Sequence, residues 1–134
     1  MSYFIDSNIC IYHLNDLDAS VSEKMEKTPA KDIKIPSVVA AELLFGAEKS
    51  VKREYNLEIV RKFLSLFEIV GFDEKSAEHY AAVRVLLERK GQILGVSDIE
   101  IASIVLANEG VLITHSVSKF SRIGGLIVED WTSH

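Results

Sequence analysis

The chain lacks several features that mark specialised classes of protein. Its single cysteine, Cys10, excludes an internal disulfide and therefore a small disulfide-stapled scaffold. No apolar run approaches the roughly 20 residues that a membrane helix needs, and Met1-Ser2-Tyr3 lacks the basic start of a signal peptide. Only two prolines occur, and no Gly/Ser-rich linker interrupts the chain. These absences predict one soluble, cytoplasmic domain over residues 1–134 with no membrane span.

An excess of positive charge is also absent. The formal net charge is −5, with 48% apolar and 26% charged residues, which is an ordinary globular balance. This charge argues against a general nucleic-acid coat protein, because such proteins are usually basic. An enzyme that acts on RNA or DNA through clustered carboxylates and a metal ion remains compatible with it.

Short apolar runs alternate with stretches of helical periodicity. The runs predict strands at residues 3–5, 33–35, 68–72, 111–114 and 126–128. The intervening stretches predict helices, except that residues 119–122 are expected to lie in a loop. Strands that alternate with helices predict an α/β fold, with a mostly parallel central sheet of four to five strands flanked by helices.

Polar side chains follow the first predicted strand directly. The sequence Tyr3-Phe4-Ile5-Asp6-Ser7-Asn8 places Asp6 where this strand ends. Ligands of parallel α/β sheets bind at the carboxyl ends of the strands. Asp6 is therefore a candidate metal ligand or catalytic group, and capping of the next helix is its alternative role.

Two further acids lie in apolar surroundings. Glu42 lies in the helix predicted over 38–45, which is apolar nearly all round and is therefore expected to be buried. No basic residue lies within one turn of Glu42, and a buried carboxylate needs a partner or a metal ion. Asp98 is expected at a helix start, where Ser97 and Glu100 fit a capping box. The helix dipole also favours an acid there, so capping alone can account for Asp98.

Asp6, Glu42 and Asp98 would repel one another if they met at one end of the sheet. A pair of like charges near 4 Å costs about 4 kcal/mol at an effective dielectric of 20, and a bound cation would offset this cost. Oxygen-only ligands select Mg²⁺ or Mn²⁺, which activate water and neutralise a phosphodiester. The histidines share no zinc-ligand spacing, and no Gly-rich phosphate loop or Ser-His-Asp pattern occurs.

Several short motifs are distributed along nearly the whole chain. They are Asp6-Ser7-Asn8-Ile9, Ala41-Glu42-Leu43, Gly46-Ala47-Glu48-Lys49-Ser50, Gly95-x-x-Asp98-x-x-Ile101-Ala102, Leu112-Ile113-Thr114 and Glu129-Asp130-Trp131. Taken together, they resemble the PIN-domain family, in particular the VapC-type toxins of prokaryotic toxin–antitoxin pairs. The resemblance implies a single PIN-like nuclease domain over residues 1–134.

The resemblance also assigns roles within the site. It implies that Asp6, Glu42 and Asp98 are the catalytic acids that bind the metal ion. It also implies that four residues support the metal site: Ser7, Asn8, Thr114 and Ser116. Ser116 departs from the family, which carries Asp or Asn there, and serine is a weak metal ligand. The fourth ligand and the number of metal ions therefore stay open.

By the same resemblance, the chain is expected to be a Mg²⁺- or Mn²⁺-dependent endoribonuclease. A homodimer and a cognate antitoxin are implied, with an apolar antitoxin segment that occupies a groove and blocks the acidic pocket. Four basic residues are candidates for contacts with the RNA backbone, with no ground for choosing among them: Lys49, Arg84, Lys119 and Arg122. Two alternatives stay open, namely a non-catalytic binding module whose site has decayed at Ser116, and a DNA-directed nuclease of the same fold.

Overall fold

Five short strands form one sheet in the computed structural model, which describes residues 1–133. The strands are β1 (Tyr3–Ile5), β2 (Ile33–Pro36), β3 (Glu68–Val70), β4 (Val111–Ile113) and β5 (Ile127–Glu129). Their order in the sheet is β3-β2-β1-β4-β5, and every neighbouring pair is parallel. The predicted α/β class and mostly parallel sheet are therefore confirmed.

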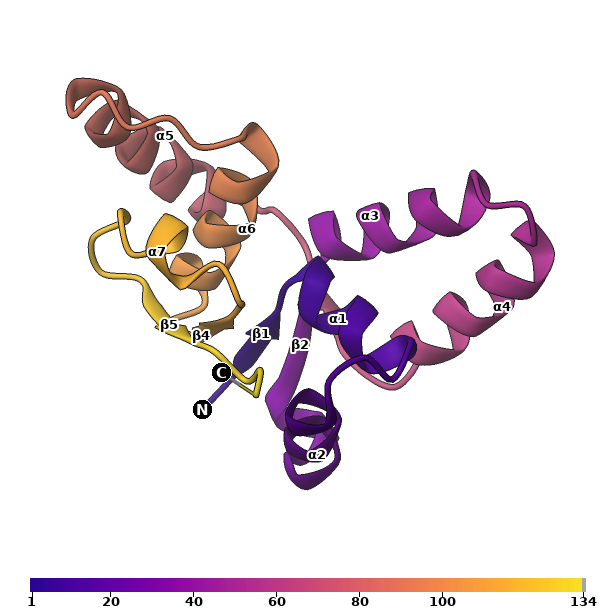
Figure 1. Ribbon diagram of the computed structural model, residues 1–134. Helices are drawn as coiled ribbons and strands as arrows, with labels where there is room; N and C mark the ends of the chain where they lie inside the picture. The colour runs from indigo at the N-terminus through magenta and orange to yellow at the C-terminus, as the bar shows by residue number, and fades with distance from the viewer. Residues whose placement is uncertain (134) are drawn as a thin grey trace.

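Helices fill the connections between the strands. They are α1 (Ser7–Leu14), α2 (Ala19–Lys27), α3 (Ser37–Glu48), α4 (Arg53–Leu64), α5 (Glu74–Arg89), α6 (Val96–Ala107) and α7 (Val117–Phe120), with a short 3-10 turn at Ala30–Asp32. Parallel strands are joined by right-handed crossovers, and the chain reverses direction across the sheet after β3. Helices α1–α4 therefore cover one face and α5–α7 the other, and α3–α4 and α5 project as two arms (Figure 1).

The core is built around the central strand β1. Phe4 and Ile5 are buried, and so are their neighbours Leu112 and Ile113 on β4. A Cβ atom on Gly110 would lie 2.5 Å from the Phe4 ring, so glycine allows the turn before β4 to approach β1. This close approach lets β4 enter the sheet beside β1, and the ends of these two strands carry the candidate site.

Helix α3 is longer than the helix predicted over 38–45, because it runs from Ser37 to Glu48 and includes Gly46. Cys10 is buried, and Asp73 caps α5 by accepting from the Ser76 N–H at 2.9 Å. Within residues 1–133, no helix is both long and apolar enough to span a membrane. The cytoplasmic location stays a prediction.

The predicted capping box at Ser97 is wrong. Helix α6 begins two residues earlier than predicted, at Val96, and its N-cap is Gly95 without a side-chain hydrogen bond. Ser97 is therefore already helical, and Asp98 is the third residue of the helix rather than the first. The expected loop at residues 119–122 is also wrong in part, because it includes the end of α7, which forms the crossover to β5.

Candidate active site

The candidate site lies where the chain changes direction in the sheet. Strands β1 and β4 are adjacent, and their last residues, Ile5 and Ile113, are paired in register. Asp6 follows Ile5, and its N–H donates to the Ile113 carbonyl at 3.1 Å. Thr114 follows Ile113 on the other strand. The carboxyl ends of two neighbouring strands with opposite crossovers form the crevice in which α/β proteins bind ligands.

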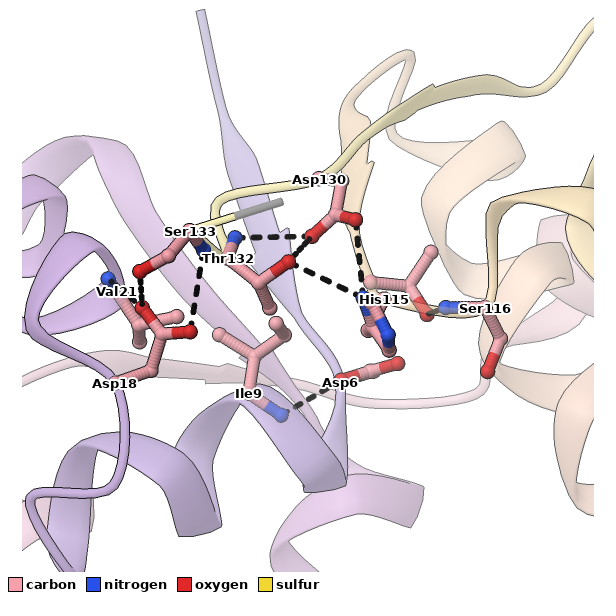
Figure 2. Close-up of polar contacts among 10 residues, drawn as sticks. Asp6, Ile9, Asp18, Val21, His115, Ser116, Asp130, Thr132 and Ser133 are labelled. Carbon is pink, nitrogen blue, oxygen red and sulfur yellow. Dashed lines mark hydrogen bonds and ion pairs between the residues drawn. The ribbon is translucent and has the colours of Figure 1, made fainter.

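Asp6 has the capping role considered from the sequence, while its role as a metal ligand stays a prediction. It caps α1, because its Oδ1 accepts from the Ile9 N–H at 3.0 Å, and Figure 2 shows this contact below the end of the sheet. The residue is only 7% exposed. Burial raises the pKa of its carboxyl above 3.8, although hydrogen bonds from Thr114 and Ile9 oppose this effect. An ionised Asp6 therefore gains from any cation that enters the site.

Glu42 is exposed, which corrects the expected burial of its helix. Helix α3 belongs to the arm that projects from the sheet (Figure 1), so one side of it meets solvent, and Phe45 is 64% exposed. The Ser7 hydroxyl donates a short hydrogen bond to Glu42 Oε1. This contact links the start of α1 to α3 and gives the Glu42 carboxylate a fixed hydrogen-bond partner.

Asp98 reaches the same place from α6. The Lys119 ammonium, on α7, lies 3.1 Å from Asp98 Oδ2. The side chains of Lys119 and Asp98 are 37% and 28% exposed, so the pair is half-buried. A positive charge thus lies inside an acidic site. The sequence alone gave no reason to prefer Lys119 over the three other basic candidates for RNA contacts.

One cavity of about 130 Å³ joins these groups. It is lined by Asp6, Ser7, Asn8, Glu42, Asp98, Ile101, Ser116, Lys119 and Phe120. Thr114 lies next to it, fully buried, and its Oγ1 accepts from the Ser116 N–H at 3.0 Å. The structure therefore brings the three predicted acids and their four supporting residues to one place.

The three carboxylates share this cavity without converging on one point. Among residues 1–133, no three His, Cys, Asp or Glu side chains are grouped closely enough to hold a metal ion as they stand. Ser7 holds Glu42 and Lys119 holds Asp98, which explains why these two acids are turned away from a common centre. The donor set consists of oxygens alone, and it suits a hard divalent cation.

The other three basic candidates lie outside the cavity lining. Lys49 stacks over the Phe45 ring at 4.9 Å, at the end of α3. Arg84 is bound on α5 to Glu88 and to the Tyr80 hydroxyl, at 3.1 and 2.9 Å. The Arg122 guanidinium donates to a backbone carbonyl at 3.5 Å. Contacts of these three residues with RNA stay predictions.

The C-terminal tail is fastened beside the site, a feature that sequence reasoning missed. His115 Nδ1 lies 3.0 Å from Asp130 Oδ2 and 3.1 Å from Thr132 Oγ1. Asp18 accepts from the Ser133 N–H and hydroxyl, at 3.1 and 2.9 Å (Figure 2). The spacing Asp130-x-Thr132 is typical of an Asx turn and was the available signal. These contacts fix the loop that carries Ser116.

Comparison with known proteins gives matches over nearly the whole chain. Residues 3–126 match the PIN domain family. The chain is 39% identical to the "Ribonuclease VapC2" of Rickettsia felis, over 98% of each protein. It is 34% identical to the "tRNA(fMet)-specific endonuclease VapC" of Shigella flexneri, over 98% of this chain and 99% of that protein.

Solved structures give the same result. The fold is similar to VapBC2 from Rickettsia felis bound to a promoter DNA fragment, with a TM-score of 0.89 and 39% identity over 98% of this chain and 99% of that one. It is also similar to DNA-bound VapBC from Salmonella typhimurium, with a TM-score of 0.92 and 32% identity over 98% of both chains. This chain therefore belongs to the PIN-domain family, and the relatives that it matches over almost their full length are VapC proteins.

Proposed function

We propose that this chain is a VapC-type endoribonuclease, the toxin of a toxin–antitoxin pair, and that it hydrolyses RNA phosphodiester bonds with a divalent metal ion. The observation that carries the proposal is the single cavity at the ends of β1 and β4, which holds Asp6, Glu42 and Asp98. Relatives named as ribonucleases or endonucleases, similar over 98% of the chain, support it.

Asp6, Glu42 and Asp98 are the residues that would hold Mg²⁺ or Mn²⁺. Their oxygen donors fit such an ion, and the burial of Asp6 makes a nearby cation favourable. When bound, the ion supplies positive charge for the phosphodiester and acidifies water. Asp6 is fixed by its hydrogen bond from Ile9, so its oxygens are already oriented before any ligand arrives.

The remaining polar groups of the cavity have separate roles in this mechanism. Glu42 is the exposed acid and is oriented by Ser7, so it accepts a proton from the attacking water and can pass it to solvent. Asn8 and Ser116 line the cavity, and they donate hydrogen bonds to phosphate oxygens. Ser116 takes this donor role because a hydroxyl binds a metal ion only weakly.

We propose that an antitoxin segment binds in a groove next to the cavity. The groove has a volume of about 300 Å³ and is formed by α1, α3 and α4, with Ile11, Leu43, Gly46 and Ile59 among its lining residues. Glu42 lines both the groove and the acidic cavity. An apolar segment in the groove would thus place a basic side chain at Glu42 and close the site. The VapBC complexes among the similar structures support this partner.

We also propose that a second copy of the chain covers the arm formed by α5. Four apolar side chains on or next to this arm are exposed: Val85, Leu86, Ile93 and Val96. A contact between two copies would bury the apolar surface of these side chains, which a monomer leaves exposed to water. Light scattering should give twice the mass of the chain, and Leu86→Glu should reduce it to that of one chain.

The decisive experiment incubates the pure protein with total RNA and with single-stranded DNA, with and without Mn²⁺, and maps the new ends. tRNA(fMet), the substrate in the name of the Shigella relative, serves as a defined RNA. Metal-dependent cleavage of RNA, absent in Asp6→Asn, is the expected result. Preferential cleavage of DNA would favour the DNA-directed alternative. Absence of cleavage together with absence of Mn²⁺ binding would favour a non-catalytic binding module.

A further inference from the structure

We propose that the Lys119 ammonium is the resident cation of the acidic cavity. It neutralises Asp98 until a divalent ion enters, and it then binds a phosphate oxygen of the RNA. This inference rests on the proposed function, since it assigns a further residue to the same site. It is carried by the placement of Lys119 among the carboxylates, which distinguishes it from the other basic residues considered above.

The position of Lys119 is fixed by the short helix α7. The next residue, Phe120, is 1% exposed and anchors α7 in the core. The Lys119 ammonium lies 5.1 Å from the centre of the Phe120 ring and 3.1 Å from Asp98 Oδ2. Lys119 and Asp6 also line the same cavity. A single ammonium thus pairs with one acid and shares the cavity with the other two.

The charges in the cavity explain what this ammonium does. Among the residues that line the cavity, three are carboxylates and Lys119 is the only base. One divalent ion would balance two of the three negative charges, and Lys119 balances the third. With Ser116 in place of a fourth acid, one ion and one lysine give a neutral site. A second metal ion is therefore not needed for charge balance.

The ion pair also explains why the carboxylates do not converge. Asp98 Oδ2 is occupied by its contact with Lys119, so a metal ion that binds this oxygen displaces the ammonium. Lys119 and the metal ion therefore compete for the same carboxylate. Once displaced, the ammonium stays at the cavity wall, because its flexible stem is tethered to α7 and carries three donors. A phosphate oxygen is the anion that then reaches it.

The test compares Lys119→Met with the wild type in two measurements. Calorimetric titration with Mn²⁺, without RNA, should show about tenfold tighter binding in Lys119→Met, because a charge-assisted competitor is gone. Cleavage of tRNA(fMet), or of the RNA found in the mapping experiment, at saturating Mn²⁺ should show a KM raised about tenfold. A merely structural role would weaken both, so opposite changes are specific to the proposal.

Matched variants control for charge and for folding. Lys119→Arg keeps the charge and should leave Mn²⁺ affinity within about twofold of the wild type. Lys34→Met removes a different lysine–carboxylate pair, 2.7 Å from Glu68 and outside the cavity, and should change neither measurement. If Lys119→Met does not fold, Lys119→Gln removes the charge while keeping a polar side chain of similar length.

The outcomes separate the inference from the proposed function. If the wild type binds Mn²⁺ and cleaves RNA, but loss of the Lys119 charge does not tighten Mn²⁺ binding, the inference is wrong and the proposed function stands. An unchanged KM would likewise overturn the phosphate contact. If neither wild type nor variant binds Mn²⁺, the proposed metal site is wrong and the inference is overturned with it.

Discussion

Substitution of Asp6 separates its structural role from its proposed chemical role. Asp6→Asn keeps an oxygen that accepts from the Ile9 N–H, whereas Asp6→Ala removes it. Loss of an N-cap costs about 1 kcal/mol, which for a domain of this size lowers Tm by roughly 3–5 °C. Both variants remove the cost of burying a charge, so the cap alone distinguishes them. Asp6→Ala should therefore melt lower than Asp6→Asn in the absence of metal.

The pH dependence of stability gives an independent measure of that cost. Burial raises the folded-state pKa of Asp6 above its ordinary value of 3.8. The stability that the protonated group contributes is fully present below the unfolded pKa and is lost as pH rises through the folded pKa. The wild type should therefore lose stability relative to Asp6→Asn between acidic and neutral pH. Urea denaturation of both proteins over this range measures the difference.

Metal binding then tests the proposed chemical role. An ion at a hundredfold excess over its Kd stabilises a protein by about 2.7 kcal/mol. The wild type should show this gain with Mn²⁺ in differential scanning calorimetry, and both variants should lose most of it together with RNA cleavage. The reasoning would be refuted if Asp6→Asn kept the full Mn²⁺ stabilisation or cleaved RNA at the wild-type rate. Equal metal-free stability of the two variants would contradict the capping role.

Three further substitutions test the groove, the strand spacing and the cavity. Gly46→Met should raise Tm and prevent antitoxin binding in co-purification, because a Cβ at this helical position meets no atom within 4 Å while the side chain fills the groove. Gly110→Ala should lower the free energy of unfolding in urea by about 1–3 kcal/mol, because its Cβ would overlap the Phe4 ring. Ser116→Asp should tighten Mn²⁺ binding about tenfold in calorimetry, because it adds a charged oxygen ligand.

Each of these substitutions has its own control. Gly71→Met places the same side chain at an open position outside the groove, and antitoxin binding that is lost there too would contradict the groove assignment. Gly110→Ala should regain part of its stability when combined with Phe4→Leu, and additive losses would exclude the contact with the ring. For Ser116→Asp, Ser118→Asp adds the same charge outside the cavity lining. Equal effects at both positions would indicate a general effect of charge.

The sheet and the location of the acids were predictable because they depend on local pattern. The short apolar runs ended in polar residues, and Asp6 and Thr114 both lie at the carboxyl ends of parallel strands as expected. Parallel strands separated by helices bring such ends to one edge. The sequence pattern therefore placed Asp6 at the edge of the sheet that forms the candidate site, whereas Glu42 and Asp98 joined it only through the family resemblance, and the catalytic roles of all three stay predictions.

Features that depend on tertiary contacts were not predictable from local pattern. Glu42 was expected to be buried because its helix is apolar, yet α3 stands on an arm and exposes it. Helix α6 starts at Val96 rather than after Ser97, so local capping propensity did not determine its first residue. Lys119 and Asp98 pair across two helices. No sequence-spacing rule distinguishes Lys119 from an ordinary surface lysine.

The central place of β1 has a consequence for protein synthesis. The first strand to leave the ribosome pairs with β2 on one side and with β4, residues 111–113, on the other. The edge of β1 that faces β4 therefore has no hydrogen-bonding strand until residues 111–113 have been translated. Prematurely terminated products that stop before β4 cannot bring Thr114 and Ser116 beside Asp6. The cavity at the ends of β1 and β4 therefore assembles only after synthesis has passed Phe120, the last of its lining residues.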